Sequence, residues 1–110
     1  MKEMNQPELL ELLELLATKG EPLVLFLHTP LCGTCKAARR MIEVAEHLLP
    51  PNLVIAEGNV NMLPDLVNTY QISSVPALLA VSADRSAEPD IIYSIHSVER
   101  VLAYIRRVTL

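Results

Sequence analysis

The two cysteines of this chain, Cys32 and Cys35, lie three positions apart in the stretch HTPLCGTCKAARRM, residues 28–41. The apolar run PLVLFLH, residues 22–28, comes just before them and has the length of a strand. If Cys32 begins a helix, side chains three residues apart come to within about 5–6 Å of one another at Cβ. Because the Cα atoms of a disulfide lie about 4.4–6.8 Å apart, this spacing predicts two thiols that can join and separate reversibly.

The same position predicts different reactivities for the two thiols. Unpaired N–H groups and a partial positive charge at the amino end of a helix favour a thiolate over a thiol. The thiolate is the nucleophilic form of cysteine. We therefore expect Cys32, at the exposed helix end, to attack a disulfide, and Cys35, one turn deeper, to resolve the mixed disulfide that forms.

Two other uses of the cysteines are open but fit less well. Buried cysteines can act as small hydrophobic core residues, although Gly33 and Thr34 between them are typical of a loop. A zinc site usually has four ligands, and the histidines at 28, 47 and 96 do not supply the H-x3–5-H spacing of such sites. We expect no metal here, because a C-x-x-C at a strand-to-helix junction is itself a redox signal.

The rest of the chain predicts the elements that position this pair. Each expected element is a hydrophobic pattern bounded by a cap, a proline or a glycine. In chain order they are a helix over 7–19 ended by Gly20, a buried strand over 23–27, a helix over about 34–49, a strand within 52–60, a short helix over 62–70, strands over 77–81 and 91–95, and a last helix from the Ser97 cap to 107. This α-β-α-β-α-β-β-α order predicts an α/β fold with a mixed sheet covered on both faces. With 110 residues, about half of them apolar, we expect one domain over 1–110.

The composition of the chain limits the kinds of partner that we expect and the compartment in which we expect the protein. The net charge is −4 and the basic clusters are short, so we expect no nucleic-acid partner. No apolar run approaches the roughly 18 residues of a membrane span, so we expect no membrane. Glu8, Glu11 and Glu14 interrupt the leucine-rich amino-terminal stretch, which therefore does not fit a secretory signal. We expect a cytoplasmic protein, in which a lone cysteine pair is more often catalytic, redox-sensing or metal-binding than structural.

Two motifs resemble the thioredoxin superfamily: CGTCK at 32–36 and ISSVPALL at 72–79. The resemblance implies a thioredoxin-like fold, with a central mixed four-stranded sheet flanked by helices on both faces. It also implies a thiol–disulfide oxidoreductase that reduces protein disulfides. Val75 and Pro76 would then join through a cis peptide bond close to the disulfide, where their backbone would pair with an extended substrate segment.

The resemblance also suggests partners. A flavin- and NADPH-dependent thioredoxin reductase would regenerate the dithiol. The Cys32–Cys35 disulfide would carry the electrons without a further cofactor, and we expect a monomer. Because several family features are missing, a redox-sensing or protein-binding module without efficient turnover is the alternative.

Three positions depart from the family pattern. Leu31, which with Gly33 and Thr34 forms the expected active-site loop, replaces the usual tryptophan before the first cysteine. Phe26 replaces a buried aspartate that assists proton transfer at the deeper thiol, and Glu57 replaces the lysine that faces it. Our hypothesis is that Glu57 supplies the missing carboxylate as proton acceptor for Cys35, because a lone acid inside an apolar strand is a candidate acid–base group. The alternative is that Glu57 reaches solvent at the end of its strand.

Four basic side chains around the cysteines are weaker candidates. His28 ends the first strand and can influence the thiolate, although a strand-end histidine is more often a surface residue. Lys36, Arg39 and Arg40 can raise the positive potential near the helix start. A solvated helix face is the simpler expectation for these three side chains.

Overall fold

The structure is a computed structural model that describes residues 1–110. Its elements follow in the order β1 (Lys2–Glu3), α1 (Gln6–Lys19), β2 (Leu23–His28), α2 (Gly33–Glu46), β3 (Val54–Asn59), the 3-10 helix η1 (Val60–Met62), α3 (Pro64–Tyr70), β4 (Ala77–Val81), β5 (Ile91–Ile92) and α4 (Val98–Thr109). Every helix predicted from the sequence is present, and so is every predicted strand.

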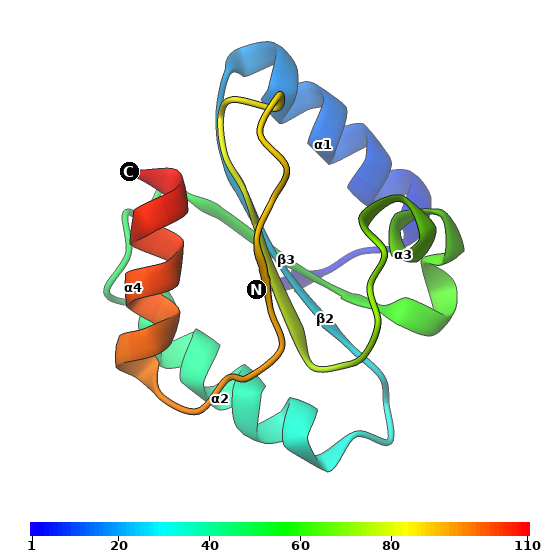
Figure 1. Cartoon of the computed structure of the whole chain (residues 1–110), viewed down its shortest axis with the longest axis vertical. Coiled ribbons are helices and arrows are strands. Elements are labelled where there is room, and N and C mark those ends of the chain that lie inside the picture. The colour runs from blue at the N-terminus through cyan, green and yellow to red at the C-terminus, as the bar shows by residue number, and fades with distance from the viewer.

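The sheet has five strands in the order β1-β3-β2-β4-β5. β3 runs parallel to both β1 and β2, whereas β4 runs antiparallel to β2 and β5. Helices α2 and α4 cover one face of this sheet, and α1 and α3 cover the other (Figure 1). The mixed sheet with helices on both faces is as predicted, but the count of four strands is wrong. The fifth strand, Lys2–Glu3, pairs with Ala56 and Glu57 on β3, and two polar residues carry no pattern that predicts a strand.

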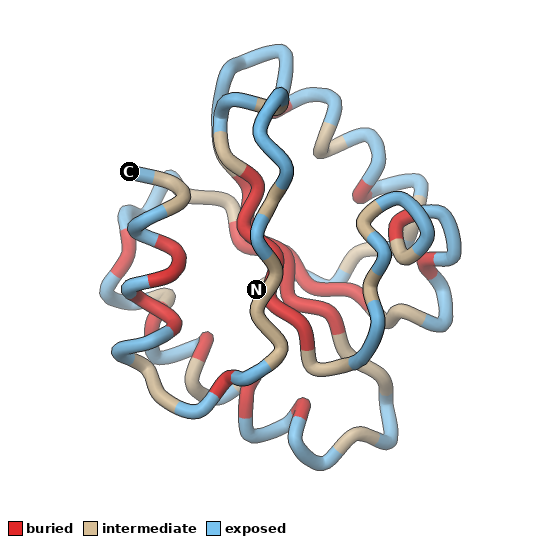
Figure 2. Tube along the Cα trace, viewed as in Figure 1, coloured by how far each residue is buried: buried red, intermediate tan, exposed pale blue.

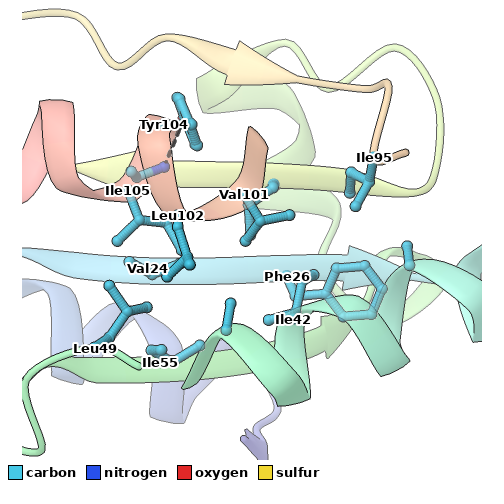
Figure 3. Packing of buried hydrophobic residues seen from close by; sticks show 14 of the residues in the cluster. Val24, Phe26, Ile42, Leu49, Ile55, Ile95, Val101, Leu102, Tyr104 and Ile105 are labelled. Atoms are coloured by element: carbon cyan, nitrogen blue, oxygen red, sulfur yellow. Dashed lines mark hydrogen bonds between the residues drawn. The ribbon is translucent and has the colours of Figure 1, made fainter. Parts of the chain in front are cut away.

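The central strands β2 and β4 are buried on both faces, which explains why they read as continuous apolar runs. Figure 2 shows this buried centre between helices that are exposed on their outer sides. Alternate residues of β2 serve two cores: Val24 and Phe26 pack toward α2 and α4, and Leu25 and Leu27 pack toward α1 and α3. Figure 3 shows the first of these cores, with Phe26 beside Ile42 of α2.

Capping residues set the helix boundaries. The side chain of Asn5 accepts a hydrogen bond from the backbone of Glu8, and the side chain of Glu8 accepts one from the backbone of Asn5, which begins α1. Gly20 ends α1 as predicted, in the left-handed conformation (φ 66°) that glycine adopts without strain. Ser97 caps α4, also as predicted. Helix α2 ends at Glu46, before the residue 49 expected from the apolar pattern.

Tyr104 links α4 to β4 and to the segment before β5 by hydrogen bonds. Its buried hydroxyl accepts a hydrogen bond from the backbone N–H of Ala80 (2.8 Å) and donates one to the carbonyl of Asp90. These contacts join β4 and the segment before β5 to one side chain of α4. β5 is shorter than predicted, since only Ile91 and Ile92 pair with β4. No helix in the structure is both long enough and apolar enough to cross a membrane.

Candidate active site

Cys32 and Cys35 form a disulfide at the amino end of α2, with their Cα atoms 5.1 Å apart. Cys32 is the N-cap: its backbone is extended, and its sulfur accepts a hydrogen bond from the backbone N–H of Cys35 at 3.1 Å. Cys32 is partly exposed, whereas Cys35 is only 4% exposed. The predicted geometry, with one accessible and one buried sulfur within bonding reach, is confirmed.

The loop around the disulfide is open to solvent. Leu31 is fully exposed (100%), although it is a large apolar side chain. Gly33 and Thr34 are also exposed, and the Thr34 hydroxyl lies 3.4 Å from the sulfur of Cys32. An apolar side chain therefore projects beside the accessible sulfur, where a partner surface can cover it.

The Val75–Pro76 peptide bond is cis, as the family resemblance implied. The next residue, Ala77, pairs with Leu27 of β2, so this bond lies at the end of the sheet where β2 leads into the cysteine loop. Both Val75 and Cys32 are partly buried and pack against the same hydrophobic core. The two segments that resemble the family motifs thus come together at one end of the sheet.

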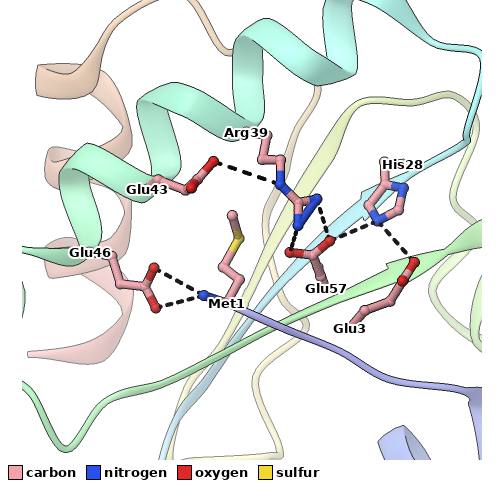
Figure 4. A network of polar contacts seen from close by, with 7 residues as sticks. All are labelled: Met1, Glu3, His28, Arg39, Glu43, Glu46 and Glu57. Carbon is pink, nitrogen blue, oxygen red and sulfur yellow. Dashed lines mark hydrogen bonds and ion pairs between the residues drawn. The ribbon is translucent and has the colours of Figure 1, made fainter.

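Glu57 is buried in the middle of the sheet, with only 1% of it exposed. It pairs in register with Phe26, on the face covered by α2. Both carboxylate oxygens accept hydrogen bonds from Arg39 of α2, at 2.5 Å and 2.6 Å (Figure 4). The alternative in which Glu57 reaches solvent is therefore wrong. The expected solvated helix face is found at Lys36 and Arg40, which are exposed, whereas Arg39 is partly exposed and paired with Glu57.

His28 lies beside this ion pair. Its side chain is 12% exposed, and its Nε2 atom is 3.2 Å from Oε1 of Glu57 and 3.7 Å from Oε1 of Glu3 (Figure 4). The surface position expected for a strand-end histidine is therefore wrong. Because β1 pairs with β3, Glu3 stands opposite Glu57 and completes a charged cluster of four residues: Glu3, His28, Arg39 and Glu57.

The sequence did not predict that Arg39 and Glu3 join Glu57 and His28 in this cluster. Arg39 follows Cys35 by four residues and lies beside the buried face of α2, so the need of a buried acid for a cation was a usable signal. Glu3 gave no signal, because its position depends on the unpredicted strand β1. The ligand atoms of Glu3, His28 and Glu57 lie within 4.8 Å of one another. Since Arg39 already binds both oxygens of Glu57, we assign this cluster to ion pairing and not to a metal.

A pocket of about 180 Å³ connects the cluster with the disulfide. Cys32, Cys35, His28 and Arg39 all line it. The other lining residues are Phe26, Thr29, Pro30 and Lys36. This volume is large enough for several water molecules. The buried sulfur of Cys35 therefore shares a solvent-sized space with an imidazole and a guanidinium.

The fold and this cysteine site define a thioredoxin-type domain, and comparison with known proteins agrees. The thioredoxin family model matches residues 10–106, so the chain belongs to the thioredoxin family. It is 33% identical to the thioredoxin-like protein YusE of Bacillus subtilis (strain 168) over 107 residues, which are 97% of this chain and 92% of that protein.

Solved structures show the same fold. Fasciola hepatica thioredoxin superposes with a TM-score of 0.78 at 18% identity, covering 98% of this chain and 99% of that one. Chloroplastic thioredoxin z superposes with a TM-score of 0.77 at 16% identity, covering 98% and 93%. The fold is therefore thioredoxin-like.

Proposed function

We propose that this protein reduces disulfides in other proteins by thiol–disulfide exchange. The observation that carries the proposal is the placement of the two sulfurs: Cys32 partly exposed at the N-cap of α2, and Cys35 buried with its Cα atom 5.1 Å away. A helix amino end stabilises the Cys32 thiolate. The backbone N–H of Cys35 already points at that sulfur, at 3.1 Å, and would stabilise negative charge on it.

The reaction follows in two exchanges. The Cys32 thiolate attacks one sulfur of a substrate disulfide, which forms a mixed disulfide and expels the other substrate sulfur as a thiolate. Cys35 then loses its proton and attacks the Cys32 sulfur. This forms the Cys32–Cys35 disulfide and releases the second substrate sulfur. The substrate gains two electrons, and this chain loses them.

Substrate docking is proposed to use the exposed surface around Cys32. Leu31 offers an apolar contact, and Gly33 and Thr34 leave the loop free of bulky side chains. Val75 and Pro76, at the same end of the sheet, would present their backbone to an extended substrate segment. The family suggests a flavin- and NADPH-dependent reductase as the electron source, a monomeric state, a cytoplasmic location and no prosthetic group.

Reduction of insulin disulfides driven by dithiothreitol tests the proposal. The parent chain is expected to accelerate precipitation of the insulin B chain over the dithiothreitol background. The Cys32→Ser variant should give only that background. A matched control is Glu14→Gln, an exposed change on α1, outside the cysteine loop and the Val75–Pro76 segment. If the parent chain and Cys32→Ser give the same rate, the proposal is wrong.

The second candidate is a redox-sensing or protein-binding module that does not turn over substrate efficiently. The observation in its favour is that both oxygens of Glu57 already accept hydrogen bonds from Arg39, so this carboxylate does not stand as an unengaged proton acceptor for Cys35. Insulin reduction at the background rate, together with a reversible Cys32–Cys35 disulfide, would favour this candidate over the enzyme.

A further inference from the structure

We infer that His28 accepts the proton of Cys35 when Cys35 resolves the mixed disulfide, and that Glu57 acts as a positioning residue for His28. The inference deepens the proposed oxidoreductase function and rests on it. It replaces the direct role of Glu57 that the sequence suggested. The observation behind it is a pocket that both His28 and Cys35 line, whereas Glu57 does not line it.

Cys35 needs a proton acceptor close by. Its sulfur must become a thiolate before it can attack Cys32, and it is only 4% exposed. Burial in apolar surroundings disfavours a charged sulfur. Phe26, the strand residue that packs in the same core, offers no acid–base group. A group in the adjoining pocket therefore has to take the proton or pass it to water.

Glu57 is poorly placed for that task. Each of its oxygens accepts a short hydrogen bond from Arg39, so the charge of this carboxylate is already paired with a cation. Glu57 is also absent from the walls of the pocket that Cys35 lines, whereas Arg39 is present there. Of this ion pair, only Arg39 therefore reaches the pocket. Arginine cannot serve as the acceptor, because it stays protonated at any physiological pH.

His28 has the chemistry and the access. It lines the pocket together with Cys32 and Cys35. Nε2 of His28 is the one buried side-chain nitrogen or oxygen without a hydrogen bond, and it faces Glu57 at 3.2 Å. The other ring nitrogen, Nδ1, also makes no hydrogen bond within the chain, but it is not fully buried. Nδ1 is therefore accessible to solvent. A neutral imidazole accepts a proton on one nitrogen while the other carries the hydrogen. In His28 that other nitrogen lies 3.2 Å from the Glu57 carboxylate without forming a hydrogen bond to it.

The charges around His28 come from three neighbouring elements. Glu3 of β1 and Glu57 of β3 face its Nε2 atom and would stabilise an imidazolium. Lys36 and Arg39 of α2 line the same pocket and oppose it. Arg39 is also paired with Glu57 and with Glu43, so its positive charge is partly offset, and Glu3 faces the ring without an arginine partner. The arrangement resembles the general logic in which a carboxylate orients a histidine for proton transfer.

The proton and the electrons balance in this step. The Cys35 thiol gives its proton to Nδ1 of His28, directly or through water in the pocket, and the resulting thiolate attacks the Cys32 sulfur. The Cys32–Cys35 bond forms and the bond between Cys32 and the substrate sulfur breaks. The substrate sulfur leaves as a thiolate and takes a proton from the imidazolium or from solvent. No external oxidant or reductant takes part.

A rapid-mixing experiment separates the two chemical steps. Reduced protein is mixed with an aromatic disulfide whose released thiol absorbs light. The first equivalent of thiol reports attack by Cys32, and the second reports resolution by Cys35. In His28→Gln, resolution is expected to slow by on the order of 10²-fold at pH 7, while attack changes less than about twofold. The resolution rate of the parent chain is expected to rise with pH through one inflection, and His28→Gln should lose that inflection.

Imidazole rescue distinguishes proton transfer from a structural role. In His28→Ala, added imidazole is expected to restore resolution in proportion to its neutral form, because the pocket is open to small molecules. His47→Gln, at the exposed carboxyl end of α2, is the control and should match the parent chain. Unchanged resolution in His28→Gln, or a parent profile without an inflection, overturns the inference while the oxidoreductase function stands. Absence of both thiol equivalents in the parent chain overturns both.

Discussion

Glu57 and Arg39 form a two-pronged ion pair that joins the centre of the sheet to α2, one helical turn beyond Cys35. The carboxylate is almost fully buried, whereas the guanidinium is partly exposed. A buried charge without a partner is strongly destabilising, so Arg39 makes the buried Glu57 carboxylate tolerable at this position. The pair fixes the distance between β3 and the helix that carries both sulfurs.

Removing the cation should destabilise the fold. We expect Arg39→Met to lower the free energy of unfolding by up to about 3–5 kcal/mol, because the buried Glu57 carboxylate loses its guanidinium partner and keeps only His28 beside it. Arg40→Met, a change at an exposed neighbour, should stay within about 0.5 kcal/mol of the parent chain. Urea unfolding of the oxidised proteins measures both. The double variant Arg39→Met/Glu57→Gln should recover part of the loss. Equal stabilities of Arg39→Met and Arg40→Met would contradict this account.

Gly58 should not tolerate a side chain. A Cβ atom at this position would lie 2.6 Å from Cδ1 of Leu63 and 3.2 Å from Cδ1 of Leu9, and both leucines are fully buried. Overpacking of this kind costs about 1–3 kcal/mol. Gly58→Ala should therefore unfold at a lower temperature than the parent chain. Gly33→Ala is the matched control, since nothing lies within 4 Å of a Cβ there. A Gly58→Ala protein as stable as Gly33→Ala would show that the packing is looser than described.

The protein should lose stability in strong alkali. Burial raises the pKa of Tyr104 above its usual value of 10.0; the Asp90 charge adds to this, while the Ala80 hydrogen bond and Arg107 oppose it. The folded state therefore holds the Tyr104 proton after the unfolded chain has released it. Above about pH 10 the unfolded chain binds fewer protons at this site, so stability falls as pH rises.

The variant Tyr104→Phe isolates that contribution. It should be about 1–2 kcal/mol less stable at pH 7, because Ala80 and Asp90 lose their hydrogen-bond partner. Its stability should then decline less steeply than that of the parent chain between pH 9.5 and 11. Urea unfolding of the oxidised proteins across this range provides the measurement. Parallel decline of the two chains would mean that Tyr104 does not contribute.

Leu31 should matter for substrates and not for folding. Its side chain is fully exposed beside Cys32, so Leu31→Ser should leave the free energy of unfolding within about 0.5 kcal/mol. If Leu31 contacts protein substrates, kcat/KM for insulin reduction should fall several-fold, mainly through a higher KM. Leu48→Ser, at an exposed site near the other end of α2, is the control. Equal kcat/KM values for the two variants would remove Leu31 from the docking surface.

Local patterns explain what the sequence could predict. β2 is a continuous apolar run between Pro22 and the cysteine loop, and this run predicts the strand and the start of the next helix. The three-residue spacing of Cys32 and Cys35 predicts that the two sulfurs can form a disulfide. β1 could not be predicted from the sequence, because Lys2 and Glu3 form a strand only by pairing with β3. The Glu57–Arg39 pair joins residues 18 positions apart. Its formation depends on how α2 docks on the sheet, and that docking is a tertiary property.

His28 illustrates the same limit. A histidine at the end of a strand is ordinarily near the surface, and its burial follows from Glu3, Glu57 and α2 closing around it. The sequence placed the acid–base role on Glu57 because that residue is a lone acid in an apolar strand. Only the arrangement in space shows that Arg39 occupies the carboxylate and that the imidazole shares the pocket with Cys35.

Trapping of the mixed disulfide tests the central claim most directly. Reduced Cys35→Ser and Cys32→Ser variants are each incubated with a peptide that contains one disulfide, and the intact masses are then measured. The account predicts that Cys35→Ser accumulates a stable adduct through Cys32, whereas Cys32→Ser stays unmodified because its remaining sulfur is buried. Adducts that form through Cys35, or on neither variant, would contradict the assignment of Cys32 as the attacking sulfur and Cys35 as the resolving one.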